Sequence, residues 1–258
     1  MNIIQSIILG IVEGLTEFLP ISSTAHLIIA SQFLQITQTD FVKTFTIAIQ
    51  LGAILSVVVL YWRKFLLDLE SLKKIIIAFI PTAVVGFIFY KIIKSFLMES
   101  DLVIALALLI GGIIIIIFEF SQKKKEEITE NSVDEITYEK AFIIGFCQSL
   151  AVIPGVSRSA ATIIGGLSLK ISRKVIVEFS FLLAVPTMLA ATGYDLMKSG
   201  VVFNSQEVVV FLIGFVVSFL TAMLAIKFFL KFITRHDFSV FGIYRIILGL
   251  GILVWTWL

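Results

Sequence analysis

Six predominantly apolar segments, each long enough to cross a lipid bilayer, constrain this chain more than any other feature. A membrane-spanning helix needs about 17–25 predominantly apolar residues. The sequence contains such segments at 44–62, 75–93, 102–120, 175–197, 208–227 and 240–258. Only 15% of the residues are charged and 59% are hydrophobic, whereas a soluble domain has roughly 25% charged and about 45–50% apolar residues. The sequence therefore excludes a soluble globular enzyme and predicts an all-α integral membrane protein.

The remaining bulk features narrow the class further. The formal net charge is +2, which is too balanced for a nucleic-acid binder, so no nucleic-acid partner is expected. Cys147 is the single cysteine and cannot form an internal disulfide, so we interpret it as a small apolar helix residue. The N-terminal segment lacks the basic region of a signal peptide and soon reaches Glu13 and Glu17, so we expect it to be retained.

Two further apolar regions, 3–36 and 141–170, are broken in the middle by proline, glycine, serine and charged residues. Each divides into two pieces that are short for a full crossing. Broken segments at membrane depth are tolerated only where protein or a water-filled cavity surrounds the exposed backbone. We therefore predict that each region is a re-entrant helix–loop–helix hairpin. The alternative is a pair of ordinary short spans.

The order of segments repeats on either side of a polar stretch at 121–140, which we interpret as a solvated linker. Each half contains one broken region followed by three spans, so the halves are predicted at 1–120 and 139–258, with a cytoplasmic linker at 121–138. Shifting the sequence by 135 residues aligns 10–29 with 145–164, and six of the twenty positions are identical. The identical pairs are Gly10/Gly145, Leu15/Leu150, Ser22/Ser157, Ala25/Ala160, Ile28/Ile163 and Ile29/Ile164. Together these observations predict a duplication.

An odd number of crossings in each half requires the halves to lie in opposite orientations, an inverted repeat with its site at the interface. Basic residues identify the cytoplasmic side. Fourteen of the twenty lie in the loops 63–74, 121–140, 170–174 and 227–235, four lie on the other side, and two, Arg158 and Arg245, lie in membrane segments. The linker side is therefore predicted to be cytoplasmic and both termini external. The two hairpins then enter from opposite faces, and their loops can meet.

Two carboxylates stand out in the first hairpin because ionisable residues within membrane segments are functional candidates by default. Glu13 and Glu17 are four residues apart, so on a helix they project from one face. Two like charges in a low-dielectric site need a metal cation, a shared proton or an arginine. Carboxylate oxygens favour Mg²⁺ or Ca²⁺ over zinc. In the alternative interpretation, both carboxylates face solvent at a frayed helix end.

Hydroxyl groups and an imidazole follow around a proline-broken turn, with Ser22, Ser23, Thr24 and His26 within five residues. A hydroxyl within reach of an imidazole is the minimum for an activated nucleophile. Helix capping by Ser22 or Thr24 is the structural alternative. It is compatible with function, because the N-terminal amides of the following helix also attract anions.

The second hairpin offers the complementary groups. Gly155 allows the backbone to turn and approach a ligand closely, while Ser157, Ser159 and Thr162 supply hydroxyl donors for substrate. Arg158 presents a bidentate cationic fork that suits phosphate; snorkelling to the surface is its alternative. Combined with the first hairpin, this set matches the needs of phosphoryl transfer. Because the site lies in the bilayer, the substrate is predicted to be a lipid phosphate or diphosphate.

The two motifs also resemble a known family. The segment EGLTEFLPISSTAH at 13–26 resembles the acidic and Ser/His region of bacterial undecaprenyl-diphosphate phosphatases, the bacitracin-resistance family. PGVSRSAAT at 154–162 resembles that family's second signature, and 49–62 and 180–196 are also similar to it, so the resemblance covers nearly the whole chain. The two signatures together are highly specific. Ala25 departs from the glycine that members often carry there, and we expect only a small effect.

The resemblance implies hydrolysis of undecaprenyl diphosphate to undecaprenyl phosphate and inorganic phosphate. This reaction occurs at the outer face of the bacterial cytoplasmic (inner) membrane, recycles the lipid carrier of wall synthesis and confers bacitracin resistance. It also implies dependence on a divalent cation. The expected partners are an isoprenoid lipid diphosphate and the bilayer, with a homodimer as a further expectation. By motif position, the acidic pair of the family falls on Glu13 and Glu17, and its proposed nucleophile falls on Ser23. The imidazole of the family falls on His26 and its phosphate-binding arginine on Arg158.

The expected mechanism has Arg158 and the second-loop hydroxyls holding the diphosphate, while the acidic pair binds the metal. Ser23 attacks the terminal phosphorus and His26 takes and returns the proton. In a variant of this mechanism, a metal-bound water attacks and Ser23 is only a ligand.

One rival function is that of a lipid-phosphate transporter or flippase, which hydropathy does not distinguish from a phosphatase, although the Ser23–His26 pair favours catalysis. A second rival, a phosphatidate-type phosphatase, lacks its basic-first signature and its pair of histidines, because His236 lies in a loop. The sequence leaves three environments open for Arg245: an ion pair with Glu119, an ion pair with Glu178, or exposure at the linker-side surface.

Overall fold

The computed structural model describes residues 1–92, 100–122, 130, 132–199 and 204–257. Its regular elements over these residues are helices, with no strand among them. Eleven are α-helices: α1 (Ile3–Thr16), α2 (Ser23–Phe33), α3 (Asp40–Leu60), α4 (Trp62–Leu67), α5 (Leu69–Ile92), α6 (Asp101–Gln122), α7 (Tyr138–Ser149), α8 (Arg158–Ser168), α9 (Arg173–Ser199), α10 (Ser205–Phe232) and α11 (Ser239–Trp257). Two short 3-10 turns are η2 (Val133–Glu135) and η3 (Leu150–Val152). The all-α class predicted from the sequence is confirmed.

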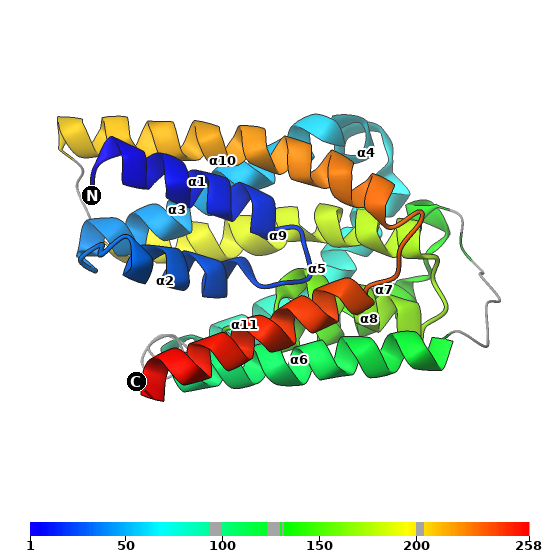
Figure 1. Cartoon of the computed structure of the whole chain (residues 1–258). Helices are drawn as coiled ribbons and strands as arrows, with labels where there is room; N and C mark the ends of the chain where they lie inside the picture. The colour runs from blue at the N-terminus through cyan, green and yellow to red at the C-terminus, as the bar shows by residue number, and fades with distance from the viewer. Residues whose placement is uncertain (93–99, 123–129, 131, 200–203, 258) are drawn as a thin grey trace.

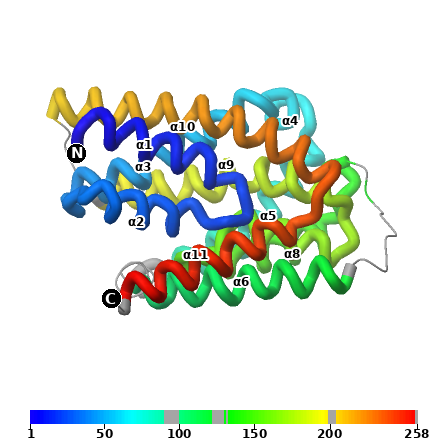
Figure 2. Tube along the Cα trace, viewed as in Figure 1, coloured from blue at the N-terminus to red at the C-terminus, as the bar shows by residue number. Residues whose placement is uncertain are grey.

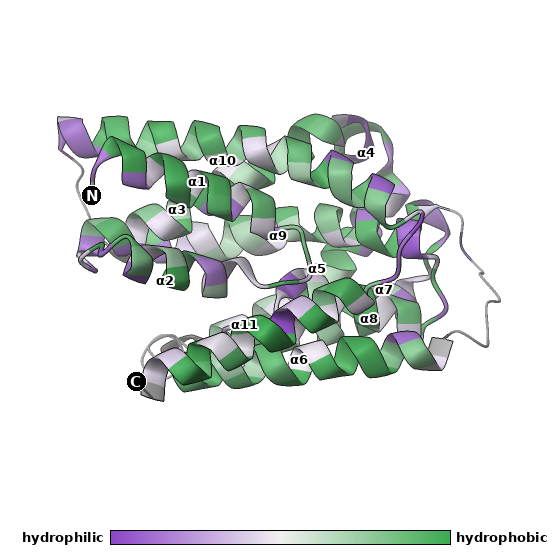
Figure 3. Cartoon of the chain, in the orientation of Figure 1, coloured by the Kyte–Doolittle hydropathy of each residue, from purple (hydrophilic) through white to green (hydrophobic). Residues whose placement is uncertain are grey.

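Six of these helices are long and apolar enough to cross a membrane: α3, α5, α6, α9, α10 and α11. They correspond one for one to the six predicted spans. Figure 1 shows them running side by side, and Figure 3 shows that their surfaces are mostly hydrophobic. α3 and α10 begin before the predicted boundaries because Thr39 and Asn204 cap them outside the apolar stretch. Asn204, for example, forms a capping box that starts α10 three residues before the predicted boundary.

The loop predicted at 63–74 is largely helical. α4 occupies most of its first half, and α5 begins at Leu69 rather than at 75. The reason is local, since the Asp68 carboxylate accepts hydrogen bonds from the Ser71 backbone N–H at 2.9 Å and from the Lys64 ammonium at 2.8 Å. A carboxylate that accepts from an N–H in the first turn stabilises the helix start.

The two broken regions each fold into two short helices joined by a loop. α1 and α2 have 14 and 11 residues, and α7 and α8 have 12 and 11. At about 1.5 Å per residue, none of them reaches the roughly 30 Å thickness of a bilayer core. Figures 1 and 2 show the α1–α2 hairpin opening towards the end that holds both chain termini and the α7–α8 hairpin opening towards the opposite end. The depth of the hairpins in a membrane stays a prediction.

Backbone details recur with the same 135-residue offset as the sequence motif. α8 repeats the bounds of α2 at this offset. Ser22 and Ser157 both have positive φ, 71° and 72°, and so do Gln35 and Lys170, at 51° and 65°. Non-glycine residues seldom adopt this conformation, so the repeated pair of outliers supports the predicted duplication, which otherwise stays a prediction.

Helices of one half pack against helices of the other. α1 lies along α10, α7 lies along α5, and α6 pairs with α11. α3 contacts both α9 and α10. The largest buried apolar cluster lies beneath the loop of the first hairpin, where the rings of Phe18 and Phe181 meet edge to face at 5.3 Å. The loops that carry the polar motifs are therefore held in the interior by helices of both halves.

One end of the molecule carries most of the ion pairs found among the described residues, and Figure 3 shows hydrophilic residues at this end around α4. The Arg173 guanidinium makes two hydrogen bonds to Glu119, at 2.5 and 2.7 Å, and the backbone N–H of Phe238 donates to the same carboxylate at 3.0 Å. The partners considered for Arg245 were therefore wrong, since Arg245 is fully buried and donates to backbone carbonyls instead. Within the linker predicted at 121–138, residues 123–129 and 131 lie outside the described residues.

Candidate active site

The loops of the two hairpins meet around a cavity of about 190 Å³. Seven of the predicted site residues line it: Glu17, Ser22, Ser23, Thr24, Gly155, Ser157 and Arg158. Gln50 of α3 and Met188 of α9 also line the cavity. The two motifs, more than 130 residues apart in sequence, therefore converge on one site.

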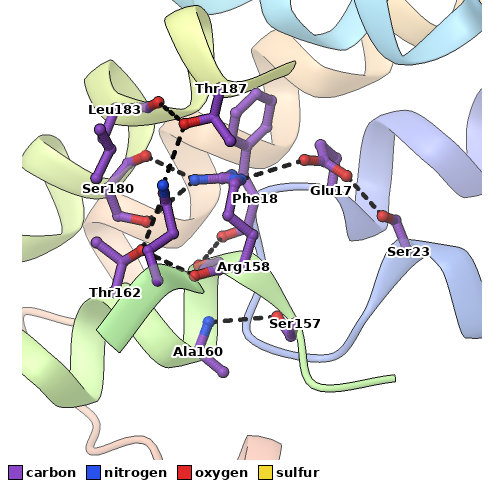
Figure 4. Close-up of polar contacts among 12 residues, drawn as sticks. Glu17, Phe18, Ser23, Ser157, Arg158, Ala160, Thr162, Ser180, Leu183 and Thr187 are labelled. Atoms are coloured by element: carbon purple, nitrogen blue, oxygen red, sulfur yellow. Dashed lines mark hydrogen bonds and ion pairs between the residues drawn. The ribbon is translucent and has the colours of Figure 1, made fainter. Parts of the chain in front are cut away.

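A chain of polar contacts crosses this site from one hairpin to the other (Figure 4). The Ser23 hydroxyl donates to Glu17 Oε2 at 2.6 Å, and the Arg158 guanidinium Nε lies 3.5 Å from Glu17 Oε1. All three residues are at least nine-tenths buried. Glu17 therefore links a hydroxyl, for which it can act as proton acceptor, to a cation that can bind phosphate.

Arg158 is held from its own side of the site as well. Its Nη1 donates to the backbone carbonyl of Ser180 at 2.8 Å, as Figure 4 shows. Nη2 has no hydrogen-bond partner among the described residues. This burial contradicts the snorkelling alternative, and the unpartnered Nη2 is a donor left over for an anion.

Local backbone geometry places Ser23 and Arg158 alike. Each is the first residue of its helix, directly after a serine of positive φ. The positive φ turns the chain sharply, so the N-termini of α2 and α8 both begin at the cavity wall. Helix N-termini carry partial positive charge and unpaired N–H groups, which favour an anionic ligand between them.

His26 has a different environment from the one expected. Its Nδ1 lies 2.7 Å from the Ser22 carbonyl oxygen, and its Nε2 lies 2.7 Å from the Tyr244 hydroxyl of α11. Because a carbonyl only accepts, Nδ1 carries the hydrogen and Nε2 accepts from the tyrosine. Both ring nitrogens are thus engaged, and the hydroxyl of Ser23 donates to Glu17 rather than to His26. Glu17, and not His26, is therefore the residue that accepts the hydrogen bond of the Ser23 hydroxyl.

Tyr244 is the residue that motif reasoning missed. It lies 218 residues from His26, and the two rings are stacked with an interplanar angle of 7°. No local spacing could have paired them. The available signal was its position next to Arg245, the intramembrane cation whose role the sequence left open.

Glu13 is the most deeply buried carboxylate of the motif. It is completely buried in α1, and neither of its carboxylate oxygens has a hydrogen-bond partner among the described residues. This burial contradicts the alternative in which both glutamates face solvent. An unsatisfied carboxylate one turn from Glu17 fits a hard divalent cation such as Mg²⁺, which is typically held by one or two carboxylates with substrate phosphates. The described part of the chain contains no cluster of three or more His, Cys, Asp or Glu.

Two predicted substrate-binding residues instead brace the loops. Ser159 donates to the Phe18 carbonyl at 2.8 Å, which ties the second hairpin to the first loop. Thr162 donates to the Arg158 carbonyl at 2.8 Å within α8. Both side chains are fully buried and neither lines the cavity. The structure therefore gives them positioning contacts, because their hydroxyl hydrogens already have carbonyl acceptors.

Ser157 and Gly155, unlike Ser159 and Thr162, line the cavity as predicted. The Ser157 hydroxyl accepts from the Ala160 backbone N–H at 3.2 Å and so caps α8. Gly155 has φ of +92°, and a Cβ there would lie 2.7 Å from the Ile104 carbonyl oxygen. Only glycine fits a turn that is both left-handed and pressed against α6.

Known proteins resemble this chain over nearly its whole length. The sequence model of the family described as Bacitracin resistance protein BacA matches residues 6–251. The chain belongs to this family. The resemblance stated from the motifs is thereby confirmed, and the BacA family together with the six apolar helices makes the chain a multi-pass membrane protein.

Several relatives within this group are about half identical to the chain. A protein of Aquifex aeolicus (strain VF5) named undecaprenyl-diphosphatase is 54% identical over 95% of both chains. One of Persephonella marina (strain DSM 14350 / EX-H1) with the same name is 55% identical over 96% of this chain and 97% of its own. One of Sulfurihydrogenibium sp. (strain YO3AOP1), again so named, is 52% identical over 99% of this chain and 100% of its own.

Proposed function

We propose that this chain is an undecaprenyl-diphosphate phosphatase, which hydrolyses the lipid diphosphate to undecaprenyl phosphate and inorganic phosphate. The observation that carries the proposal is the Ser23–Glu17–Arg158 chain of contacts inside a cavity between two helix N-termini. It joins a nucleophile, a proton acceptor and a phosphate-binding cation, the set that phosphoryl transfer needs. The names of the relatives, and a membrane-embedded scaffold that suits an isoprenoid lipid, support the substrate.

The residues suggest the following sequence of steps. Glu17 accepts the hydroxyl proton as Ser23 Oγ bonds to the terminal phosphorus, and the bond from that phosphorus to the bridging oxygen breaks. Undecaprenyl phosphate leaves with the bridging oxygen. Glu17 gives this proton to the departing phosphate. Water then attacks the phosphoseryl phosphorus, its proton passes through Glu17 to Ser23 Oγ as the Oγ–P bond breaks, and inorganic phosphate and the free Ser23 are released. Arg158 Nη2, which has no hydrogen-bond partner in the described part of the chain, donates to the phosphoryl oxygens throughout.

Glu13 and Glu17 are the residues that would hold a divalent cation, as their burial and the unsatisfied oxygens of Glu13 suggest. When bound, such a cation would neutralise charge on the phosphate oxygens. His26 holds the Ser22 carbonyl, and Tyr244 holds His26, so the pair fixes the turn that presents Ser23.

Measuring phosphate release by the purified full-length protein in detergent tests the proposal. We expect release from undecaprenyl diphosphate that is lost with a chelator and lost in Ser23→Ala. Rapid quench of the wild type with labelled substrate should trap phosphoserine at position 23. The matched control is Ser168→Ala, which removes a hydroxyl bonded only within α8 and should leave the rate unchanged. Substrate binding without phosphate release would overturn the proposal and favour the lipid transporter.

The membrane arrangement is also part of the proposal. We place the chain in the bacterial inner membrane with both termini outside, the cavity opening to the outer face, and bacitracin resistance as its phenotype. The bias of basic residues towards one side supports this orientation. Cysteines introduced one at a time near the N-terminus and in the loop after α10 should react with impermeant reagents from opposite sides of the membrane. A homodimer stays a prediction.

A further inference from the structure

Arg245 lies in the middle of the last span and is fully buried. Its guanidinium donates four hydrogen bonds, and all four acceptors are backbone carbonyls. Nη1 donates to Pro20 at 3.2 Å and to Val156 at 3.0 Å, while Nη2 donates to Gly155 at 2.9 Å and to Ala107 at 3.0 Å. One side chain therefore joins the loop of the first hairpin, the loop of the second hairpin and α6.

These acceptors lie next to the reacting groups. Pro20 comes three residues before Ser23, and Val156 comes two residues before Arg158. A guanidinium is planar and holds its donors in a fixed fork, so the carbonyls that it binds keep a fixed separation. The distance between the nucleophile and the phosphate-binding arginine is thus set partly by a residue that touches neither.

The space around the guanidinium is shaped to admit it. At Gly111 of α6, a Cβ would lie 2.3 Å from Arg245 Nη2 and 2.9 Å from Cζ, and the three nearest atoms all belong to this guanidinium. Such separations are far inside normal van der Waals contact. Because the guanidinium is already bonded to four carbonyls, it cannot move away without breaking some of them.

The positive charge of Arg245 also has no carboxylate partner in the described part of the chain, where its contacts are the four carbonyls. Burying a cation without an anion is costly. Carbonyl dipoles offset part of this cost. The remaining positive charge lies beside the cavity, because Gly155 lines the cavity and also accepts a hydrogen bond from Arg245. This charge favours an anionic ligand in the cavity.

We propose that Arg245 is a positioning residue of the phosphatase site, which holds the two catalytic loops together through their backbone carbonyls. The inference rests on the proposed function, since the geometry that it fixes is that of Ser23 and Arg158. Misplacement of reacting groups by about 1 Å lowers rates by about 10²-fold. Loss of this contact should therefore act mainly on kcat.

Three variants in the purified full-length protein test the proposal through phosphate release. Arg245→Met should lower kcat by about 10²-fold, with KM changed less than about threefold. Arg245→Lys keeps the charge but offers a point donor instead of a fork, so its kcat should fall between those of the wild type and Arg245→Met. Gly111→Ala keeps Arg245 and displaces it, so its kcat should fall about tenfold.

A matched control and a double variant separate positioning from general damage. Gly251→Ala adds the same methyl group in α11, where nothing lies within 4 Å, and should leave kcat unchanged. Gly111→Ala should add no further loss in the Arg245→Met background, because the methyl group then has no guanidinium to displace. Additive losses, or a Gly111→Ala enzyme as fast as the wild type, would overturn the proposal.

Hydrogen–deuterium exchange supplies a readout that does not need activity. In Arg245→Met and in Gly111→Ala, exchange should rise together in the segments 17–22 and 150–157. A rise in neither segment, or in only one, contradicts a contact that joins both loops. If the wild type releases no phosphate, the proposed function fails, while the exchange measurement still decides whether Arg245 holds the loops.

Discussion

The loops of the two hairpins have similar backbone conformations but carry different side chains. Ser22 and Ser157 occupy equivalent turns of positive φ, yet the next residue is Ser23, the proposed nucleophile, in the first hairpin and the cation Arg158 in the second. His26 likewise corresponds to Ala161 at the same offset. Two hairpins of similar backbone conformation thus present complementary side chains to a single cavity. The proposed function depends on the side chains in which the two hairpins differ.

The first helices of the hairpins show the same contrast in their buried polar groups. Glu13 corresponds to Gln148. The Gln148 amide donates to the Thr82 and Thr187 hydroxyls at 2.9 and 3.1 Å, whereas both Glu13 oxygens have no partner in the described chain. The second hairpin satisfies its buried polar group within the described protein, whereas the first leaves its buried carboxylate without such a partner. We therefore propose that position 13 serves function and position 148 serves stability.

The largest effect is expected from removing the cation that only the second hairpin provides. Arg158→Ala should lower kcat/KM for phosphate release by about 10³-fold, because it removes a preorganised donor in a water-poor site. The control is Arg235→Ala, which changes an exposed arginine in a loop and should keep full activity. Retention of most activity in Arg158→Ala would contradict the assignment of the phosphate-binding group.

Exchanging the residue types at positions 13 and 148 should separate function from stability. Glu13→Gln removes an unpaired buried charge, so the melting temperature should stay level or rise while phosphate release falls by about 10²-fold. Gln148→Glu should instead lower stability by about 1–3 kcal/mol, because the amide donors to two threonines are lost. Thermal unfolding in detergent, followed alongside activity, measures both. A less stable Glu13→Gln protein would show that the carboxylate has a structural role.

A smaller effect is expected where the first hairpin uses an imidazole and the second has alanine. Tyr244→Phe and His26→Gln should each lower kcat by about tenfold, since both loosen the turn before Ser23. If His26 were the proton acceptor instead, His26→Gln would lose far more activity than Tyr244→Phe. A pH–rate profile of the Tyr244→Phe enzyme gives an independent check, and its shape should match that of the wild type.

The smallest effect concerns the two serines of positive φ. Ser157→Ala removes the hydroxyl that caps Ala160 N–H, so stability should fall by about 1 kcal/mol. Ser22 makes no side-chain cap, so Ser22→Ala should leave the melting temperature nearly unchanged. Equal destabilisation by the two substitutions would show that the helix starts are equivalent in more than their backbone.

Much of this arrangement could be predicted because it depends on local composition. The apolar runs predict the six long helices, and the breaks in 3–36 and 141–170 predict the loops where the motifs meet. The partners of Arg245 could not be predicted, because backbone carbonyls exist at every position and leave no pattern in the sequence. The position of His26 was misjudged for a similar reason. It lies three positions after Ser23, but Tyr244 and the Ser22 carbonyl determine where its ring points.

Chain order gives Arg245 a consequence for biosynthesis. α11 follows every other described helix, so translation delivers its arginine after both loops have been made. The carbonyls of Pro20 and Val156 are synthesised 225 and 89 residues before Arg245, the residue that donates to them. A nascent chain that has not yet inserted α11 has both motifs but lacks the contact that brings them together. The contact between the two loops therefore depends on the insertion of α11.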